Sequence, residues 1–126
     1  MKFLLVFLGG GLGSALRYFL NEIVYQYAKY SFLCWTIIVN VFGCFIMGAL
    51  VYLFLEKTNL PEYQRLFLTV GFCGGLTTFS GFTAEIFKLI QAGELYKGLL
   101  YAVFSIFFTL IAFVLGILFV KKFNLA

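Results

Sequence analysis

The stretch that decides the fold reads Gly71-Phe72-Cys73-Gly74-Gly75-Leu76-Thr77-Thr78-Phe79-Ser80-Gly81-Phe82. It lies inside an uncharged run, residues 66–84, which is about long enough to cross a bilayer core as a helix. Glycine and hydroxyl residues are poor helix formers in the interior of such a run. Two interpretations follow: a helix broken near 74–80 whose freed carbonyls coordinate a cation, or a continuous helix that packs closely through Gly71 and Gly75. The residues themselves leave both open.

The composition of the whole chain places this stretch in a membrane protein. Of 126 residues, 63% are hydrophobic and 11% are charged, and the mean hydropathy is +1.06. Soluble domains are about 45–50% apolar, and a soluble fold of this length has too little interior for more. A water-soluble enzyme, a disordered tail and a nucleic-acid-binding module are thereby excluded. The sequence indicates no enzyme chemistry.

We expect an all-α, multi-pass membrane domain covering residues 1–126. Its four predicted spans are 3–28, 31–55, 63–90 and 96–120, because a crossing needs about 20 apolar residues. A cleavable signal peptide is the alternative for the first apolar run, which lacks a small-x-small cleavage site.

The distribution of cations gives a weak orientation signal. Four crossings put both termini on one side, and the Lys/Arg bias between loops sets orientation. The cations on the side of the termini are Lys2, Lys57, Arg65, Lys121 and Lys122. Those on the other side are Lys29, Lys88 and Lys97, with Arg17 as a fourth. This count allows either a single orientation or insertion both ways round.

Several polar side chains fall inside the predicted spans. Asn40 lies four residues after Thr36 on one helical face, and either cross-links two helices or lines a wet path. Arg17 is either functional within the membrane or reaches back to the interface. Glu85 precedes Lys88 by three residues, a spacing that suits an ion pair at the membrane edge.

Hydroxyl and aromatic residues add neutral hydrogen-bond donors and ring edges. Tyr101 and Ser105 recur four residues apart on one face of the fourth span, and Phe79 and Phe82 flank the polar stretch. Aromatic rings have a positive edge that can face an anion. With no His in the chain, this inventory suits a small anion that accepts hydrogen bonds strongly. Four short helices enclose little volume, so a pore would need an oligomer.

Two other functions remain open on these residues. A small proton-coupled multidrug exporter needs a carboxylate in the middle of the first span, where the sequence offers only Arg17. A non-transporting membrane scaffold subunit needs no more than the glycine contacts.

Three motifs together resemble the Fluc/CrcB fluoride channel family. The motifs are Gly9-Gly10-Gly11-Leu12-Gly13-Ser14-Ala15-Leu16-Arg17-Tyr18, Trp35-Thr36-Ile37-Ile38-Val39-Asn40-Val41-Phe42-Gly43-Cys44-Phe45-Ile46-Met47-Gly48 and the opening stretch. The chain departs from the family pattern at Trp35, Cys44 and Gly81, where the family has Gly, Ser and Thr. The loss of a hydroxyl at Gly81 bears on the polar lining beside the phenylalanines.

The resemblance implies an antiparallel homodimer of dual topology, with the third helix broken in mid-membrane at the dimer centre. It implies passive export of cytoplasmic fluoride through the bacterial inner membrane. A structural sodium ion would lie at the dimer interface, held by the backbone carbonyls of Gly74 and Thr77. The implied fluoride pore consists of Asn40, Phe79, Ser80, Phe82, Thr83, Tyr101 and Ser105. Arg17 and Glu85 are the implied vestibule or gating residues.

Overall fold

The computed structural model describes residues 1–27, 34–56 and 59–123. Two of the cations counted above, Lys29 and Lys57, lie outside the described residues. So do residues 28 and 31–33 of the expected spans. Among the described residues, four helical stretches are long and apolar enough to cross a membrane: Lys2–Tyr27, Trp35–Glu56, Glu62–Gln91 and Leu95–Phe123. The expectation of an all-helical chain with four membrane-capable helices is confirmed.

Three of these stretches are single helices. They are α1 (Lys2–Tyr27), α2 (Cys34–Glu56) and α6 (Leu95–Phe123). The stretch between α2 and α6 contains four elements in succession: α3 (Glu62–Arg65), the π-helix η1 (Leu66–Cys73), α4 (Gly74–Leu76) and α5 (Phe79–Gln91). The π-helical turns are not among the features that the sequence predicts.

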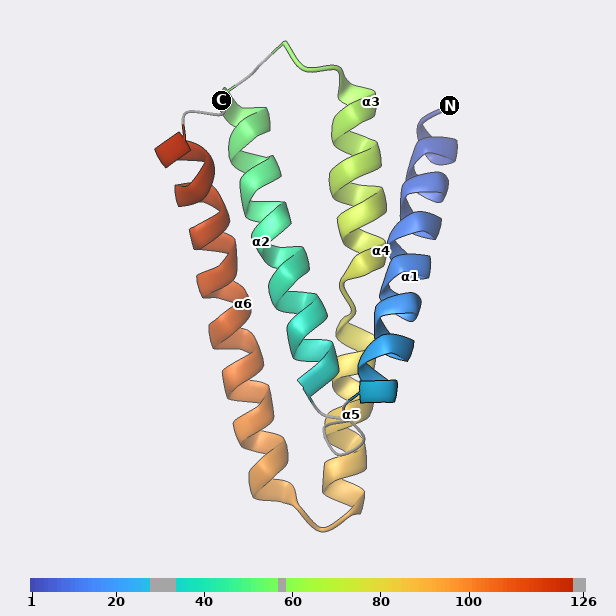
Figure 1. The fold of residues 1–126 in the computed structure, drawn as a ribbon, viewed down its shortest axis with the longest axis vertical. Helices are drawn as coiled ribbons and strands as arrows, with labels where there is room; N and C mark the ends of the chain where they lie inside the picture. Colours follow the sequence, from blue (N-terminus) through green and yellow to red (C-terminus); the bar gives the residue numbers. More distant parts are fainter. Residues whose placement is uncertain (28–33, 57–58, 124–126) are drawn as a thin grey trace.

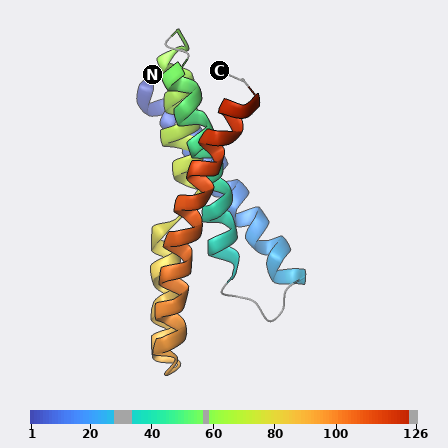
Figure 2. The same ribbon diagram turned by 90° about the vertical axis from the view of Figure 1, so that its left-hand side faces the viewer.

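The helices pack as two pairs that share the composite third stretch. α1 packs against η1 and α4, and α2 packs along α6. Figure 1 shows the beginning of α1 and the end of α6 at the same end of the molecule, as four crossings require. Figure 2 shows that α5 and α6 run side by side and diverge from the lower parts of α1 and α2.

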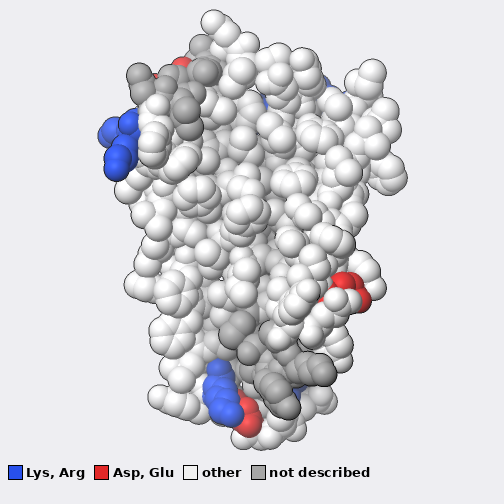
Figure 3. All heavy atoms as spheres, viewed as in Figure 1, with Lys and Arg blue, Asp and Glu red and all other residues white. Residues whose placement is uncertain are grey.

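The surface fits a protein that spans a bilayer. On the face drawn in Figure 3, most charged side chains lie near the two ends, with a wide uncharged region between them. Many large apolar side chains along α6 are exposed, including Val103, Phe107 and Leu110. In water such a surface would be unfavourable, whereas in lipid it costs nothing.

Glycines bring both helix pairs into backbone contact. A Cβ on Gly48 of α2 would overlap the Phe113 carbonyl of α6, and one on Gly75 of α4 would overlap the Gly10 carbonyl of α1. The packing interpretation of the glycine-rich stretch is therefore correct for Gly75. Small residues of this kind allow close helix approach in membranes.

We predict that Gly48→Ala lowers the free energy of unfolding by about 1–3 kcal/mol, the usual cost of overpacking. The added methyl group meets backbone, so the α2–α6 pair must separate. Gly11→Ala is the matched control, because in the described parts of the chain no atom outside its two neighbours and the nearby backbone of its own helix lies within 4 Å of the position that its methyl group would take. Denaturation by titrated SDS measures both variants. Equal stabilities of Gly48→Ala and the wild type would contradict the close α2–α6 packing.

Candidate functional site

The third stretch is interrupted at two residues. Thr77 (φ −82°, ψ 155°) and Thr78 (φ −148°, ψ 117°) have extended backbones between the end of α4 and the beginning of α5. This interval is narrower than the expected 74–80, because residues 74–76 and 79–80 are helical. Gly75 packs against the backbone of α1, and this contact holds the short α4 turn in place.

Asn40 of α2 binds the interruption in place of the missing helical bonds. Its Nδ2–H donates to the Thr78 carbonyl at 3.0 Å, and the Thr78 N–H donates to Asn40 Oδ1 at 2.7 Å. One amide side chain therefore satisfies both main-chain groups of a residue that has left the helix. In a low-dielectric surrounding, leaving those groups unpaired would be costly.

Thr78 also begins the second half of the stretch. Its Oγ1 accepts a hydrogen bond from the Gly81 N–H at 2.9 Å, which makes Thr78 the N-cap of α5. The Ser80 hydroxyl lies 3.2 Å from the same oxygen. The free N–H groups and positive dipole end of α5 thus begin at the interruption, an arrangement that favours negative charge.

The Gly74 and Thr77 carbonyls are among the backbone carbonyls that lose their helical donors at this point. In a continuous helix, the Thr78 N–H would reach the Gly74 carbonyl and the Gly81 N–H would reach the Thr77 carbonyl. Here these donors bind Asn40 Oδ1 and Thr78 Oγ1 instead. The Gly74 and Thr77 carbonyls are the two that the family resemblance assigns to sodium. Their chemistry fits the ion, since backbone carbonyls are hard oxygen ligands for small cations.

Arg17 of α1 binds another carbonyl freed by the interruption. Its Nε–H donates to the Gly75 carbonyl at 3.1 Å, and the Ser14 hydroxyl donates to the same oxygen at 3.4 Å. The arginine is half-buried and anchored in the site. It therefore ties α1 to the interrupted stretch and sits beside the point where the helix breaks.

The two phenylalanines lie together but differ in exposure. The ring centroids of Phe79 and Phe82 are 5.3 Å apart with an interplanar angle of 44°. Phe79 is 78% exposed in the single chain, whereas Phe82 is 8% exposed and stacks on Tyr101 of α6 at 5.7 Å. Only Phe79 is therefore left open on the surface of one chain.

Glu85 joins three helices below the phenylalanines. It is 7% exposed, and its two carboxylate oxygens accept hydrogen bonds from Thr36 of α2, at 2.5 Å, and from the Tyr101 hydroxyl of α6. Ser105, one helical turn beyond Tyr101, is also buried, and its hydroxyl has no hydrogen-bond partner among the described residues. A buried hydroxyl of this kind has a free donor and acceptor.

A cavity of about 340 Å³ opens between α1, the beginning of α2 and α5. We call it the α1–α5 cavity. Its lining residues are Ser14, Arg17, Tyr18, Asn21, Trp35, Thr36, Thr78, Gly81, Ala84, Glu85 and Lys88. It reaches the interruption at Thr78 and contains both expected vestibule residues.

Other expected pore residues lie away from this cavity. Thr83 is exposed and its hydroxyl donates to the Phe79 carbonyl of its own helix at 3.0 Å. Ser80 and Phe79 are exposed, whereas Phe82, Tyr101 and Ser105 form a buried group along α5 and α6. Sequence reasoning did not find Trp35 or Lys88 as cavity residues. The sequence analysis did single out three other lining residues, Arg17, Thr36 and Glu85.

The family model described as "CrcB-like protein, Camphor Resistance (CrcB)" matches residues 4–117. The chain belongs to the CrcB family. A relative from Azobacteroides pseudotrichonymphae is 41% identical over 91% of this chain and 92% of its own length. One from Thermus thermophilus is 45% identical over 91% of both chains, and one from Methylobacterium is 47% identical over 82% of both. All three bear the name "Fluoride-specific ion channel FluC".

Membership of the CrcB family and the four membrane-capable helices make this chain a multi-pass membrane protein. The family assignment made from the three motifs is confirmed. The motifs that carried it, around Arg17, Asn40 and Thr77-Thr78, are the segments that meet at the interruption.

Proposed function

We propose that this CrcB protein is a fluoride channel that lets fluoride leave the cytoplasm passively and so limits its toxicity. The observation that carries the proposal is the interrupted helix whose Thr78 backbone is bound at both ends by Asn40. The names of its relatives support fluoride as the ion. They do not favour the multidrug exporter or the scaffold subunit, and they name a channel rather than an enzyme.

Fluoride is strongly hydrated, so a dry passage must replace its water with hydrogen-bond donors. Asn40 keeps a second amide N–H after its bond to Thr78, since the side chain has two donors. The ring edges of Phe79 and Phe82 and the Ser80 hydroxyl add neutral donors around the beginning of α5. Thr83 is a proposed lining residue beside them, although its hydroxyl donates to the Phe79 carbonyl in the single chain. Tyr101 and Ser105 extend this polar lining along α6.

The route needs a second copy of the chain. Phe79 is 78% exposed in the single chain and lies beside the helix interruption, so its ring is open to a partner there. We propose an antiparallel homodimer of dual topology, in which the interruptions of two inverted copies meet in mid-membrane. The nearly balanced Lys/Arg count supports insertion in both orientations. Each Phe79 would then face the route formed with the partner.

Sodium is proposed as the structural ion at the centre of this dimer. The Gly74 and Thr77 carbonyls would hold it, because the donors that would occupy them in a helix are bound elsewhere. When bound, the ion satisfies these carbonyls electrostatically. Arg17 and Ser14 already bond the neighbouring Gly75 carbonyl, so that carbonyl is not assigned to the ion.

We predict that protein purified throughout without sodium, in N-methylglucamine buffer, forms a less stable dimer. An ion that binds only the folded state at about 100 times its Kd stabilises it by about 2.7 kcal/mol. The fraction of dimer that remains after heating to each temperature, measured by size-exclusion chromatography, gives the difference in dimer stability. Identical melting curves with and without sodium would remove the ion from the proposal.

Fluoride efflux from liposomes tests the proposed function. Purified protein is reconstituted into vesicles loaded with potassium fluoride, and a potassium ionophore is added while an electrode records external fluoride. We expect rapid fluoride release and little chloride release from matched vesicles. Folded protein that releases no fluoride, or that releases both ions equally, would contradict the proposal.

A further inference from the structure

We propose that Lys88 serves the fluoride route by making the α1–α5 cavity, together with Arg17, a collecting site for small hydrated anions. The inference rests on the proposed function and assigns a role to the outer part of the same site. Lys88 is absent from all three family motifs, and its role follows from its position in this structure.

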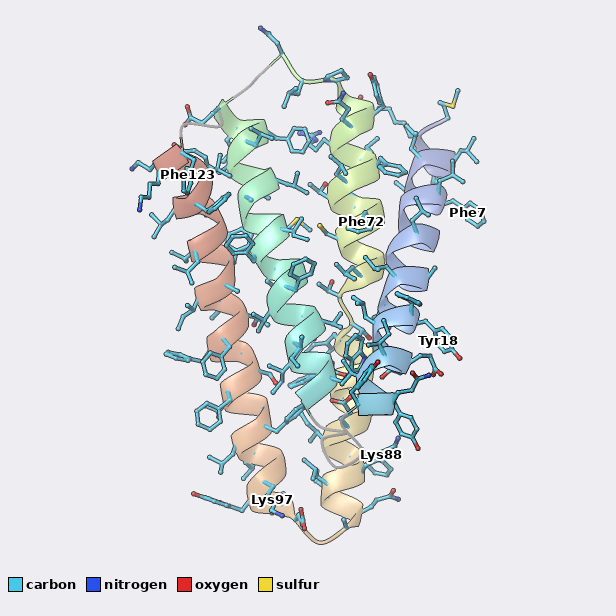
Figure 4. The ribbon with its side chains drawn as sticks, viewed as in Figure 1. Phe7, Tyr18, Phe72, Lys88, Lys97 and Phe123 are labelled. Carbon is cyan, nitrogen blue, oxygen red and sulfur yellow. The ribbon has the colours of Figure 1, made fainter. Side chains whose placement is uncertain are left out.

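Two cations from different helices line one cavity. Arg17 comes from α1 and Lys88 from α5, and no other Lys or Arg is among the cavity's lining residues in the described parts of the chain. Arg17 is half-buried and anchored to the Gly75 carbonyl, whereas Lys88 is exposed. Figure 4 shows Lys88 on α5 near the lower part of α1, with Lys97 closer to the turn into α6. The cavity therefore has an outer and an inner positive charge.

The acidic residue of the cavity, Glu85, accepts hydrogen bonds from two other helices. Both carboxylate oxygens of Glu85 accept hydroxyl hydrogen bonds, from Thr36 of α2 and from Tyr101 of α6. Two cations against one hydrogen-bonded carboxylate leave the lining with a positive balance. A concave wall of one charge sign raises the local concentration of the oppositely charged ion.

The size of the cavity defines what it can hold. A water molecule occupies about 30 Å³ in the liquid, so a volume of 340 Å³ accepts an anion with several of its waters. A hydrated ion interacts with Lys88 by charge and not by size. The cavity therefore collects fluoride and chloride alike, and selection occurs further on, beyond Thr78 at its inner end.

The expected effect depends on ionic strength. One unit charge about 7 Å from an anion in water changes its local concentration about threefold. At about 0.01 M salt the screening length is about 30 Å, and at about 1 M it is about 3 Å. Loss of a charge on the cavity wall should therefore lower efflux at low salt and have little effect at high salt, where the charge is screened. A substitution that damages the structure would lower efflux at both salt concentrations.

The test compares Lys88→Gln, Lys88→Arg and Lys97→Gln in the liposome assay at these two ionic strengths, set with an impermeant salt. Lys97 is the matched control, since its ammonium pairs with Glu94 at 2.9 Å and it does not line the cavity. We expect Lys88→Gln to reduce fluoride efflux about threefold at low salt and hardly at all at high salt. Lys88→Arg and Lys97→Gln should match the wild type, and the fluoride-to-chloride ratio should stay constant.

Each outcome decides the inference. Unchanged low-salt efflux in Lys88→Gln overturns it, as does a reduction that persists at high salt or that Lys97→Gln shares. A changed fluoride-to-chloride ratio places Lys88 in selection and also overturns it. Wild-type protein that releases no fluoride overturns the proposed function itself, whereas an active wild type with an unaffected Lys88→Gln overturns only the role of Lys88.

Discussion

Replacing Asn40 with leucine should lower fluoride efflux about hundredfold or more while the chain remains folded and dimeric. Leucine has a similar size but cannot bond the Thr78 carbonyl or its N–H, which Asn40 holds at 3.0 and 2.7 Å. Each part-buried group left unpaired costs about 1–3 kcal/mol. The interruption then adopts another backbone conformation, and the donors around α5 no longer point at one route. Size-exclusion chromatography and the fluoride electrode measure both properties.

Two further variants make the result specific to this contact. Asn40→Asp keeps an acceptor for the Thr78 N–H but places a carboxylate against the Thr78 carbonyl and in the path of an anion, so its efflux should be equally low. Thr69→Val is the matched control, because the Thr69 hydroxyl donates only within its own stretch, to the Arg65 carbonyl at 2.7 Å. Wild-type efflux in both Asn40 variants would show that the amide neither shapes nor lines the route.

Phe79→Ile and Phe82→Ile should both reduce fluoride efflux about tenfold, with different effects on stability. Both changes remove an aromatic ring edge, which isoleucine cannot replace. Phe82 is 8% exposed and stacked on Tyr101, so its loss should also lower the free energy of unfolding by about 1–3 kcal/mol. Phe79 is 78% exposed in the single chain, so Phe79→Ile should leave that chain's stability nearly unchanged.

Phe7→Ile is the control for this pair. Phe7 of α1 is 74% exposed, projects outward in Figure 4 and belongs to no part of the site. The fluoride efflux and the stability of Phe7→Ile should match those of the wild type. If Phe79→Ile conducts normally while Phe82→Ile conducts poorly and is unstable, the phenylalanines act through packing alone, and the ring-edge account is wrong.

The helical architecture could be predicted because it depends on hydrophobic length alone. Uncharged runs long enough to cross a bilayer predicted the second and fourth helices, which the structure describes as Cys34–Glu56 and Leu95–Phe123. The π-helical turns of Leu66–Cys73 could not be predicted, since their sequence is a plain apolar run. The two residues of the interruption within 74–80 also had to come from the structure. Gly74 and Gly75 have poor helix propensity, but contact of Gly75 with α1 keeps this turn helical.

The partners of the polar residues required the structure. Spacing along one helix related Glu85 to Lys88, and the charge of Lys88 does act on the Glu85 carboxylate. The hydrogen bonds from Thr36 and Tyr101, which are 49 and 16 residues away in the sequence, could not be predicted in this way. Asn40 was expected to face either another helix or a wet path. It binds the Thr78 backbone and retains one amide N–H for the proposed anion. Such long-range pairs leave no periodic signal in a single sequence.

An experimental structure of the purified protein in sodium fluoride tests the central claim most directly. The account predicts two inverted copies whose Thr77-Thr78 segments meet in mid-membrane, with ion density between the Gly74 and Thr77 carbonyls of both chains. Two parallel copies, or interruptions that lie far apart and face lipid, would contradict it.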